Sequence, residues 1–231
     1  MPTVLITGAG RGLGLEFATQ YAHAGYTVHA TSRQSPEDNS DLRELQRRYP
    51  RHVRLHQLDL ESDTAIDALS ASLRDESIDL LINNAAYGRK SPDFPATDEK
   101  SWRRSMRVNA FAMLKMASAF HRQVARSQDK TMVALSSEMG SIARNTTGGR
   151  YNYRASKAAL NMIIKSLAVD LASLGICVVS LHPGWVKTAM GGPDAQLTPI
   201  QSVERLRKII AELSPSCSGR FFSYDGAEIP W

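Results

Sequence analysis

Thr7-Gly8-Ala9-Gly10-Arg11-Gly12-Leu13-Gly14 stands near the start of the 231-residue chain, between a short apolar run and an amphipathic stretch. Glycines at such a junction allow a tight turn and let backbone N–H groups approach a pyrophosphate at a helix N-terminus, where the helix dipole favours anions. The pattern therefore predicts a dinucleotide-binding turn. A flexible glycine loop is the alternative, and the strand–turn–helix context disfavours it.

Outward from this turn, short apolar runs rich in Val, Ile and Leu alternate with amphipathic stretches. We expect strands at Val4–Thr7, Thr27–Thr31, Val53–Leu58, Leu80–Asn83, Met132–Ser136, Ile176–Leu181 and Arg220–Ser223. We expect helices at Leu13–Ala24, Asp41–Tyr49, Thr64–Leu73, Asp98–Arg126, Tyr153–Leu174 and Pro199–Leu213. The alternation predicts an α/β fold, a Rossmann-type doubly wound parallel sheet with helices on both faces, as a single domain over residues 1–231.

Composition excludes several classes of protein. The chain is 42% hydrophobic and 22% charged, which supports a full core and argues against overall disorder. Its net charge of +5 is mild, and without an RNP-like aromatic run or a recognition helix we expect no nucleic-acid partner. Cys177 and Cys217 form no CxxC pattern and the six histidines no HExxH pair, so we expect no disulfide scaffold and no metal. Without a basic leader or an 18-residue apolar stretch, we expect a soluble, cytoplasmic protein with no membrane partner.

The end of the second expected strand indicates which dinucleotide binds. NAD-binding proteins usually place Asp or Glu there to hold the ribose 2′-OH. This strand ends Ala30-Thr31-Ser32-Arg33-Gln34, with no acid. Arg33, together with Arg11 in the glycine turn, can pair with a 2′-phosphate, which predicts NADP(H) as the cofactor. The alternative is that both arginines are simply solvated.

Tyr153 and Lys157 stand four residues apart at the start of an apolar-faced helix, which places them on one face. A free tyrosine has a pKa near 10, and a neighbouring ammonium would favour the phenolate. Such a pair can give a proton to a carbonyl oxygen as hydride reaches its carbon. Tyr-x-x-x-Lys is common on ordinary helices, and its place downstream of a dinucleotide turn favours the catalytic interpretation. Tyr151 lacks such a partner, because Ala155 stands four residues beyond it.

Further motifs follow in order along the chain. They are Asn83-Asn84-Ala85-Ala86, Asn109 in Arg107-Val108-Asn109-Ala110, the pair Ser136-Ser137, and Pro183-Gly184. With the glycine turn and the tyrosine–lysine pair, this order resembles the short-chain dehydrogenase/reductase family over nearly the whole chain. Ala86 departs from that family, which usually has glycine there.

The stretches Leu181–Gly192 and Gly226–Trp231 are similar to the subgroup that contains the C-factor signalling proteins and the sniffer carbonyl reductases. That resemblance implies NADPH-dependent reduction of a carbonyl substrate. It also leaves open a dinucleotide-binding signalling or sensor protein with little turnover. Oligomeric state stays open between a monomer and a homo-oligomer, a dimer or tetramer.

The resemblance implies a role for each matching catalytic residue. Tyr153 would donate the proton, and Lys157 would hold the nicotinamide ribose and favour the phenolate. Ser137 would hold the substrate oxygen, with Ser136 and Ser141 as competitors. Asn109 would hold a water that links Lys157 to solvent, unless it is only a polar residue inside a helix. The 16-residue gap from Ser137 to Tyr153 exceeds the family's common spacing and indicates a longer loop at the mouth of the site.

The resemblance also implies where the cofactor lies. Backbone at Gly8, Gly12 and Leu13 would face the pyrophosphate, with Gly10 and Arg11 in the same turn. The remaining expected cofactor residues follow later strands and are Asp59 and Leu60 at the adenine, Asn84, Ala85 and Ala86 at the adenosine, and Pro183, Gly184, Val186 and Thr188 near the nicotinamide or phosphate. Each of these polar residues could instead be a simple turn former.

The substrate is a small carbonyl or alcohol of unspecified structure. The loops expected to shape its pocket are 86–97, 138–152 and 185–197. Phe94, Tyr151, Trp185 and Met190 in these loops indicate tolerance of an apolar or aromatic substrate.

Overall fold

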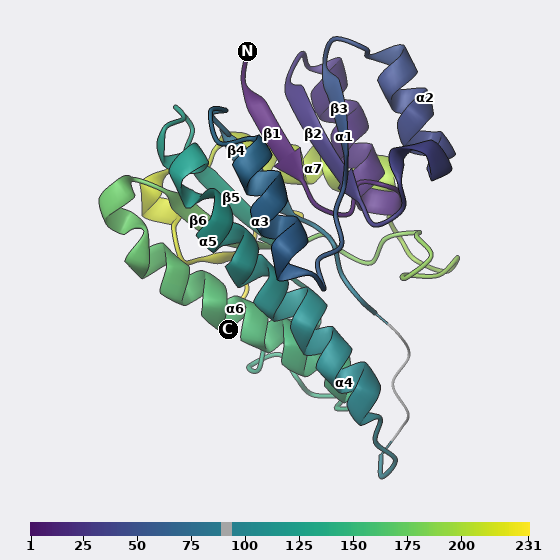
Figure 1. Cartoon of the computed structure of the whole chain (residues 1–231). Helices are drawn as coiled ribbons and strands as arrows, with labels where there is room; N and C mark the ends of the chain where they lie inside the picture. Colours follow the sequence, from purple (N-terminus) through teal and green to yellow (C-terminus); the bar gives the residue numbers. More distant parts are fainter. Residues whose placement is uncertain (89–93) are drawn as a thin grey trace.

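A computed structural model of the chain describes residues 1–88 and 94–231. Residues 89–93, part of the loop expected to shape the pocket, lie outside the described residues. Seven parallel strands form one sheet in the order β3-β2-β1-β4-β5-β6-β7 (Figure 1). Their bounds are β1 Thr3–Ile6, β2 Thr27–Ser32, β3 Val53–Gln57, β4 Leu80–Asn83, β5 Thr131–Leu135, β6 Cys177–His182 and β7 Phe221–Ser223.

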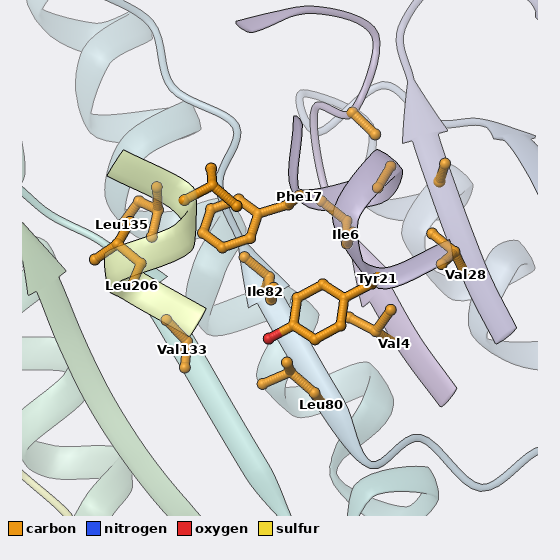
Figure 2. Close-up of a cluster of buried hydrophobic side chains, with 14 of the residues drawn as sticks. Val4, Ile6, Phe17, Tyr21, Val28, Leu80, Ile82, Val133, Leu135 and Leu206 are labelled. Carbon is orange, nitrogen blue, oxygen red and sulfur yellow. The ribbon is translucent and has the colours of Figure 1, made fainter. Parts of the chain in front are cut away.

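Helices cover both faces of the sheet. Their bounds are α1 Gly12–His23, α2 Ser40–Arg48, α3 Asp63–Ser72, α4 Glu99–Met106, α5 Ala112–Ala125, α6 Tyr151–Asp170 and α7 Pro199–Ala211. Apolar side chains of α1, α2 and α7 pack on one face, and Figure 2 shows Phe17, Tyr21 and Leu206 against this side of the strands. Helices α3, α5 and α6 cover the other face, through side chains such as Ile66, Phe120 and Ile164 (Figure 1). The expected doubly wound fold is confirmed.

Strand order explains where the site must lie. The chain crosses from β3 at one edge back past β1 to β4, so the order reverses between β1 and β4. In open parallel sheets, ligands bind beyond the carboxyl ends of the strands at such a reversal. The glycine turn follows β1, the Asn84–Ala86 segment follows β4, and both therefore meet at this point.

The long helix expected over Asp98–Arg126 is the largest difference in secondary structure. Asp98 begins α4 by accepting a hydrogen bond from Ser101 N (3.0 Å), and α5 ends at Ala125. Between α4 and α5 lies a π-helical turn, Arg107–Phe111, which apolar periodicity does not reveal. Such turns within α-helices are frequent at functional sites. No helix among the described residues is long and apolar enough to cross a membrane.

Candidate active site

The glycine turn is as tight as the sequence predicts. Gly8 and Gly12 have φ of +66° and +56°, a region that favours glycine because it has no Cβ. A Cβ on Gly14 would lie 2.2 Å from the carbonyl oxygen of Gly8, so α1 packs directly against the turn. The two left-handed residues and this close approach bring backbone, rather than side chains, to the carboxyl end of β1.

Residues that follow β4 hold the turn in place. The Asn84 side chain donates to the main-chain oxygens of Thr7 (2.9 Å) and Gly8 (3.1 Å). The Thr7 hydroxyl accepts from the backbone N–H groups of Asn84 (3.0 Å) and Ala85 (3.1 Å). The structure therefore uses the Asn84 amide to shape the turn, and direct contact with adenosine stays a prediction. The role of Thr7 was missed, because a strand-end threonine carries no specific sequence signal.

The turn fits a phosphate-bearing ligand. Arg11 precedes α1, and its side chain makes no capping hydrogen bond, so it does not occupy the first N–H groups of the helix. Thr188, from the segment after β6, lies across the turn with its methyl carbon 3.4 Å from the position a Gly12 Cβ would take. Arg11 and Arg33 are both exposed, and neither pairs with an acidic side chain in the described part of the chain. Helix N–H groups and two unpaired guanidinium groups suit a dinucleotide with a 2′-phosphate.

The other expected cofactor residues lie at strand ends and turns. Asp59 accepts a hydrogen bond from the Glu61 backbone N–H (3.0 Å). Ala86 does not have a positive φ, which explains how alanine can stand where the resembled family has glycine. Gly184 has φ +80°, and a Cβ there would lie 2.6 Å from Leu197. Leu60 and Ala85 line a small cavity that Asn109 and Lys157 also line. Val186 is buried, and Pro183 O accepts a hydrogen bond from the Ser202 hydroxyl (2.7 Å). Contact of these residues with a cofactor stays a prediction.

Ser137, Tyr153 and Lys157 come together despite the long loop between the first two. Ser137 follows β5 and starts the 3-10 turn Glu138–Gly140, and its hydroxyl accepts from Met139 N (3.2 Å). Lys157 is 2% exposed, and its Nζ lies 5.7 Å from the centre of the Tyr153 ring. The same Nζ donates to the main-chain oxygen of Leu135 at 2.6 Å. The phenol and the amine therefore lie close together at the end of β5, the strand that Ser137 follows.

Burial sets the ionisation of this group differently from the sequence-based expectation. It raises the pKa of Tyr153, and the hydrogen-bonding hydroxyl of Ser137 and the charge of Arg150 offset only part of that shift. Burial also lowers the pKa of Lys157 to about 7. The lysine therefore loses its proton at a lower pH than the tyrosine does. That Lys157 favours the phenolate when an oxidised nicotinamide adds its positive charge stays a prediction.

The competing serines have other partners. Ser136 donates to Asn161 Oδ1 (2.7 Å), and Ser141 donates to Pro230 O (2.5 Å). Ser137 alone of the three influences the Tyr153 pKa, which favours it as the serine of the site.

Asn109 lies in the π-helical turn, with its side chain already bonded. Its Oδ1 accepts from Tyr87 N (2.6 Å), and its Nδ2 donates to Tyr87 O (2.9 Å) and Ser156 Oγ (2.9 Å). These bonds tie the segment after β4 to α6. A cavity of about 10 Å³, room for a single water, is lined by both Asn109 and Lys157. That Asn109 holds a water there stays a prediction. Both amide hydrogens of Asn109 are already donated, to Tyr87 O and Ser156 Oγ.

The side chains expected to shape a substrate pocket separate into two groups. Met190 lies against Gly88, where an added Cβ would come 2.7 Å from its sulfur, and Trp185 Nε1 donates to Gly191 O (2.7 Å). Phe94 and Tyr151 instead line a cavity of about 380 Å³ between the start of α4 and the start of α6, which neither Trp185 nor Met190 lines. Among the described residues, no group of three or more His, Cys, Asp or Glu could hold a metal.

The chain is similar to known proteins in both sequence and fold. The family model described as short chain dehydrogenase matches residues 2–197. The C-signal protein of Myxococcus xanthus is 43% identical over 154 residues, which are 67% of this chain and 93% of that protein.

Solved structures extend the likeness to the whole chain. The carbonyl reductase Sniffer of D. melanogaster superposes with a TM-score of 0.92 at 33% identity, covering 100% of both chains. The NADPH-bound carbonyl reductase from chicken fatty liver superposes with a TM-score of 0.93 at 30% identity, covering 100% of this chain and 99% of that one.

Proposed function

The chain belongs to the short-chain dehydrogenase family, and on that premise we propose that it is an NADPH-dependent reductase that converts a small aldehyde or ketone to an alcohol. The observation that carries the proposal is the grouping of Ser137, Tyr153 and the buried Lys157 at the end of β5. A structural helix would not require a lysine that is 2% exposed beside a phenol, since burying a lysine costs free energy. Perturbed pKa values of this kind cluster at functional sites.

NADP(H) is the cofactor that the glycine turn fits. Gly8, Gly10, Gly12 and Leu13 would offer backbone to the pyrophosphate, and Arg11 and Arg33 would pair with the 2′-phosphate. Lys157 would hold the nicotinamide ribose, because an ammonium has three N–H donors and Leu135 O takes one of them. The NADPH in the similar chicken carbonyl reductase supports this assignment.

The residues of the site divide the reaction between them. When bound, NADPH supplies a hydride to the carbonyl carbon. Tyr153 donates its phenolic proton to the carbonyl oxygen. Because burial raises the pKa of Tyr153, the phenol stays protonated until this transfer. Ser137 donates a hydrogen bond to the same oxygen and so favours the charge that develops there. Hydride and proton together make the alcohol, and the reverse sequence oxidises it.

Loss of NADPH absorbance with a panel of aldehydes, quinones and diketones tests the proposal, with NADH in parallel. We expect turnover with at least one class of carbonyl and a preference for NADPH. No turnover with any of them, despite measurable NADPH binding, would contradict reductase activity. Equal use of NADH would remove the role given to Arg11 and Arg33.

A second candidate function is signalling, and the likeness to the C-signal protein favours it. In that case the chain would bind the dinucleotide with little turnover. Tyr153→Phe separates the two functions, because an enzyme loses turnover and keeps its cofactor. A signalling protein would keep its biological effect in the same variant.

A further inference from the structure

The closing segment Ile229–Trp231 reaches the loop that carries Ser137, although β5 and β7 are not neighbours in the sheet. Ser141 is 1% exposed, and its hydroxyl donates to Pro230 O at 2.5 Å, with Trp231 O at 3.3 Å. The backbone N–H of Ala143 donates to Trp231 O at 3.1 Å. Two residues of the loop are therefore bound to two residues of the segment.

The segment is itself fixed to β7. Ile229 is 2% exposed, and its backbone N–H donates to Phe221 O (2.8 Å). The Trp231 ring stacks on the Phe221 ring, with centroids 5.5 Å apart and planes at 15°. Phe221 is fully buried, so the tryptophan rests on a rigid part of the core.

The turn between Ser137 and Ser141 has little freedom on its other side. A Cβ on Gly140 would lie 2.8 Å from the Cβ of Lys157, so this turn packs directly on α6. Gly140 N donates to Ser137 O (2.7 Å), which makes the position of the serine depend on the turn. The turn is thus held between α6 and the closing segment.

We propose that Ile229–Trp231 is a positioning element, which holds the turn after β5 so that the Ser137 hydroxyl faces Tyr153. The expected effect on kcat rests on the proposed function. It gives a role to Ile229–Trp231, a segment that takes no direct part in the proposed reaction. Trp231 touches no reacting atom and acts through the Ser141 and Ala143 bonds.

Kinetics of four variants test the proposal: Trp231→Ala, Trp231→Phe, Ser137→Ala and the double variant Trp231→Ala/Ser137→Ala. We expect Trp231→Ala to lower kcat about tenfold, because a misplaced catalytic group costs this much or more. The KM for NADPH should stay within about twofold, since the glycine turn is untouched. Trp231→Phe keeps a ring on Phe221 and should restore kcat.

The double variant distinguishes positioning from general support of the fold. If the segment acts through Ser137, Trp231→Ala should cost less than about twofold once Ser137 is alanine, because coupled residues are not additive. An unchanged kcat in Trp231→Ala, or the same tenfold loss in both backgrounds, would overturn the proposal. Should Trp231→Ala fail to fold, Ser141→Ala removes the hydroxyl that binds the segment, which also accepts from Arg144 N (3.2 Å), and carries the same expectations.

Hydrogen exchange tests the contact without turnover, so it stands even if no carbonyl substrate is reduced. In Trp231→Ala, we expect amides of residues 138–145 to exchange about tenfold faster, while those of β1 and β4 do not change. Unchanged exchange in 138–145 would show that the segment does not hold the loop.

Discussion

The glycine turn before α1 and the tyrosine–lysine pair on α6 meet beyond the same ends of the strands, yet they are built from different groups. The turn offers backbone N–H groups and two exposed arginines. The pair consists of side chains inside the fold, of which Lys157 is 2% exposed, and desolvation shifts the pKa values of both Tyr153 and Lys157. Binding by the first region depends on the shape of the backbone. The ionisation of the second depends on the low dielectric that the surrounding fold creates.

The difference teaches what each region should tolerate. A backbone site fails when a side chain intrudes on the turn, because the N–H groups then move. A buried side-chain site fails when one functional group is removed, even if the fold is intact. Substitutions in the two regions should therefore damage binding and chemistry separately.

Tyr153→Phe should have the largest effect. It removes the proton donor and leaves the glycine turn, so we expect kcat/KM for carbonyl reduction to fall about 10³-fold. NADPH affinity, measured by fluorescence titration, should stay within about threefold. Matching losses of affinity and turnover would mean that the two regions do not act separately.

Gly14→Ala tests the backbone region. The added methyl would lie 2.2 Å from Gly8 O and 2.5 Å from Asn84 Nδ2, so the turn must shift. We expect a loss of about 3 kcal/mol in unfolding free energy by urea denaturation, together with weaker NADPH binding. Gly88→Ala is the control, because the three atoms nearest to its methyl all belong to the flexible Met190 side chain, and it should cost less than about 1 kcal/mol. Equal stability of the two variants would contradict the close approach at Gly14.

These two regions also differ in how far the sequence predicts them. The glycine turn, all seven strands and the grouping of Ser137 with Tyr153 follow from local pattern and motif order. The π-helical turn around Asn109 does not, because it covers only five residues, too few to stand out in the apolar spacing. The pKa of Tyr153 does not either, since burial by distant segments sets it.

The pH dependence of stability should come from the side-chain region. Burial lowers the pKa of Lys157 from 10.5 to about 7, so between these values the unfolded chain holds a proton that the native chain has released. The contribution of Lys157 to unfolding free energy should therefore rise with pH, by about 2 kcal/mol from pH 7 to pH 9.

Urea denaturation at several pH values measures this contribution as the difference between wild type and Lys157→Met. The exposed Lys100→Met is the control and should keep the wild-type slope. The same slope in Lys157→Met would mean that the lysine titrates normally.

Arg11→Ala and Arg33→Ala should have the smallest effect, and they test whether these arginines of the backbone region bind the 2′-phosphate. Each should weaken NADPH binding about tenfold, because each removes one charge-assisted pair with the 2′-phosphate. NADH binding should not change, and neither should NADPH binding in Arg51→Ala, which alters an exposed arginine elsewhere. Parallel losses for NADPH and NADH would point to a role at the pyrophosphate instead.

The central claim is that burial keeps Tyr153 protonated and ready to donate. Titration of the free protein by ¹³C NMR, with the tyrosine Cζ carbons labelled, measures this directly, and the Tyr153→Phe spectrum assigns the signal. Burial predicts a titration midpoint above the ordinary value of 10 for this residue. A midpoint below 10 in the free protein would show that a neighbouring charge outweighs burial, and the account of the site would be wrong.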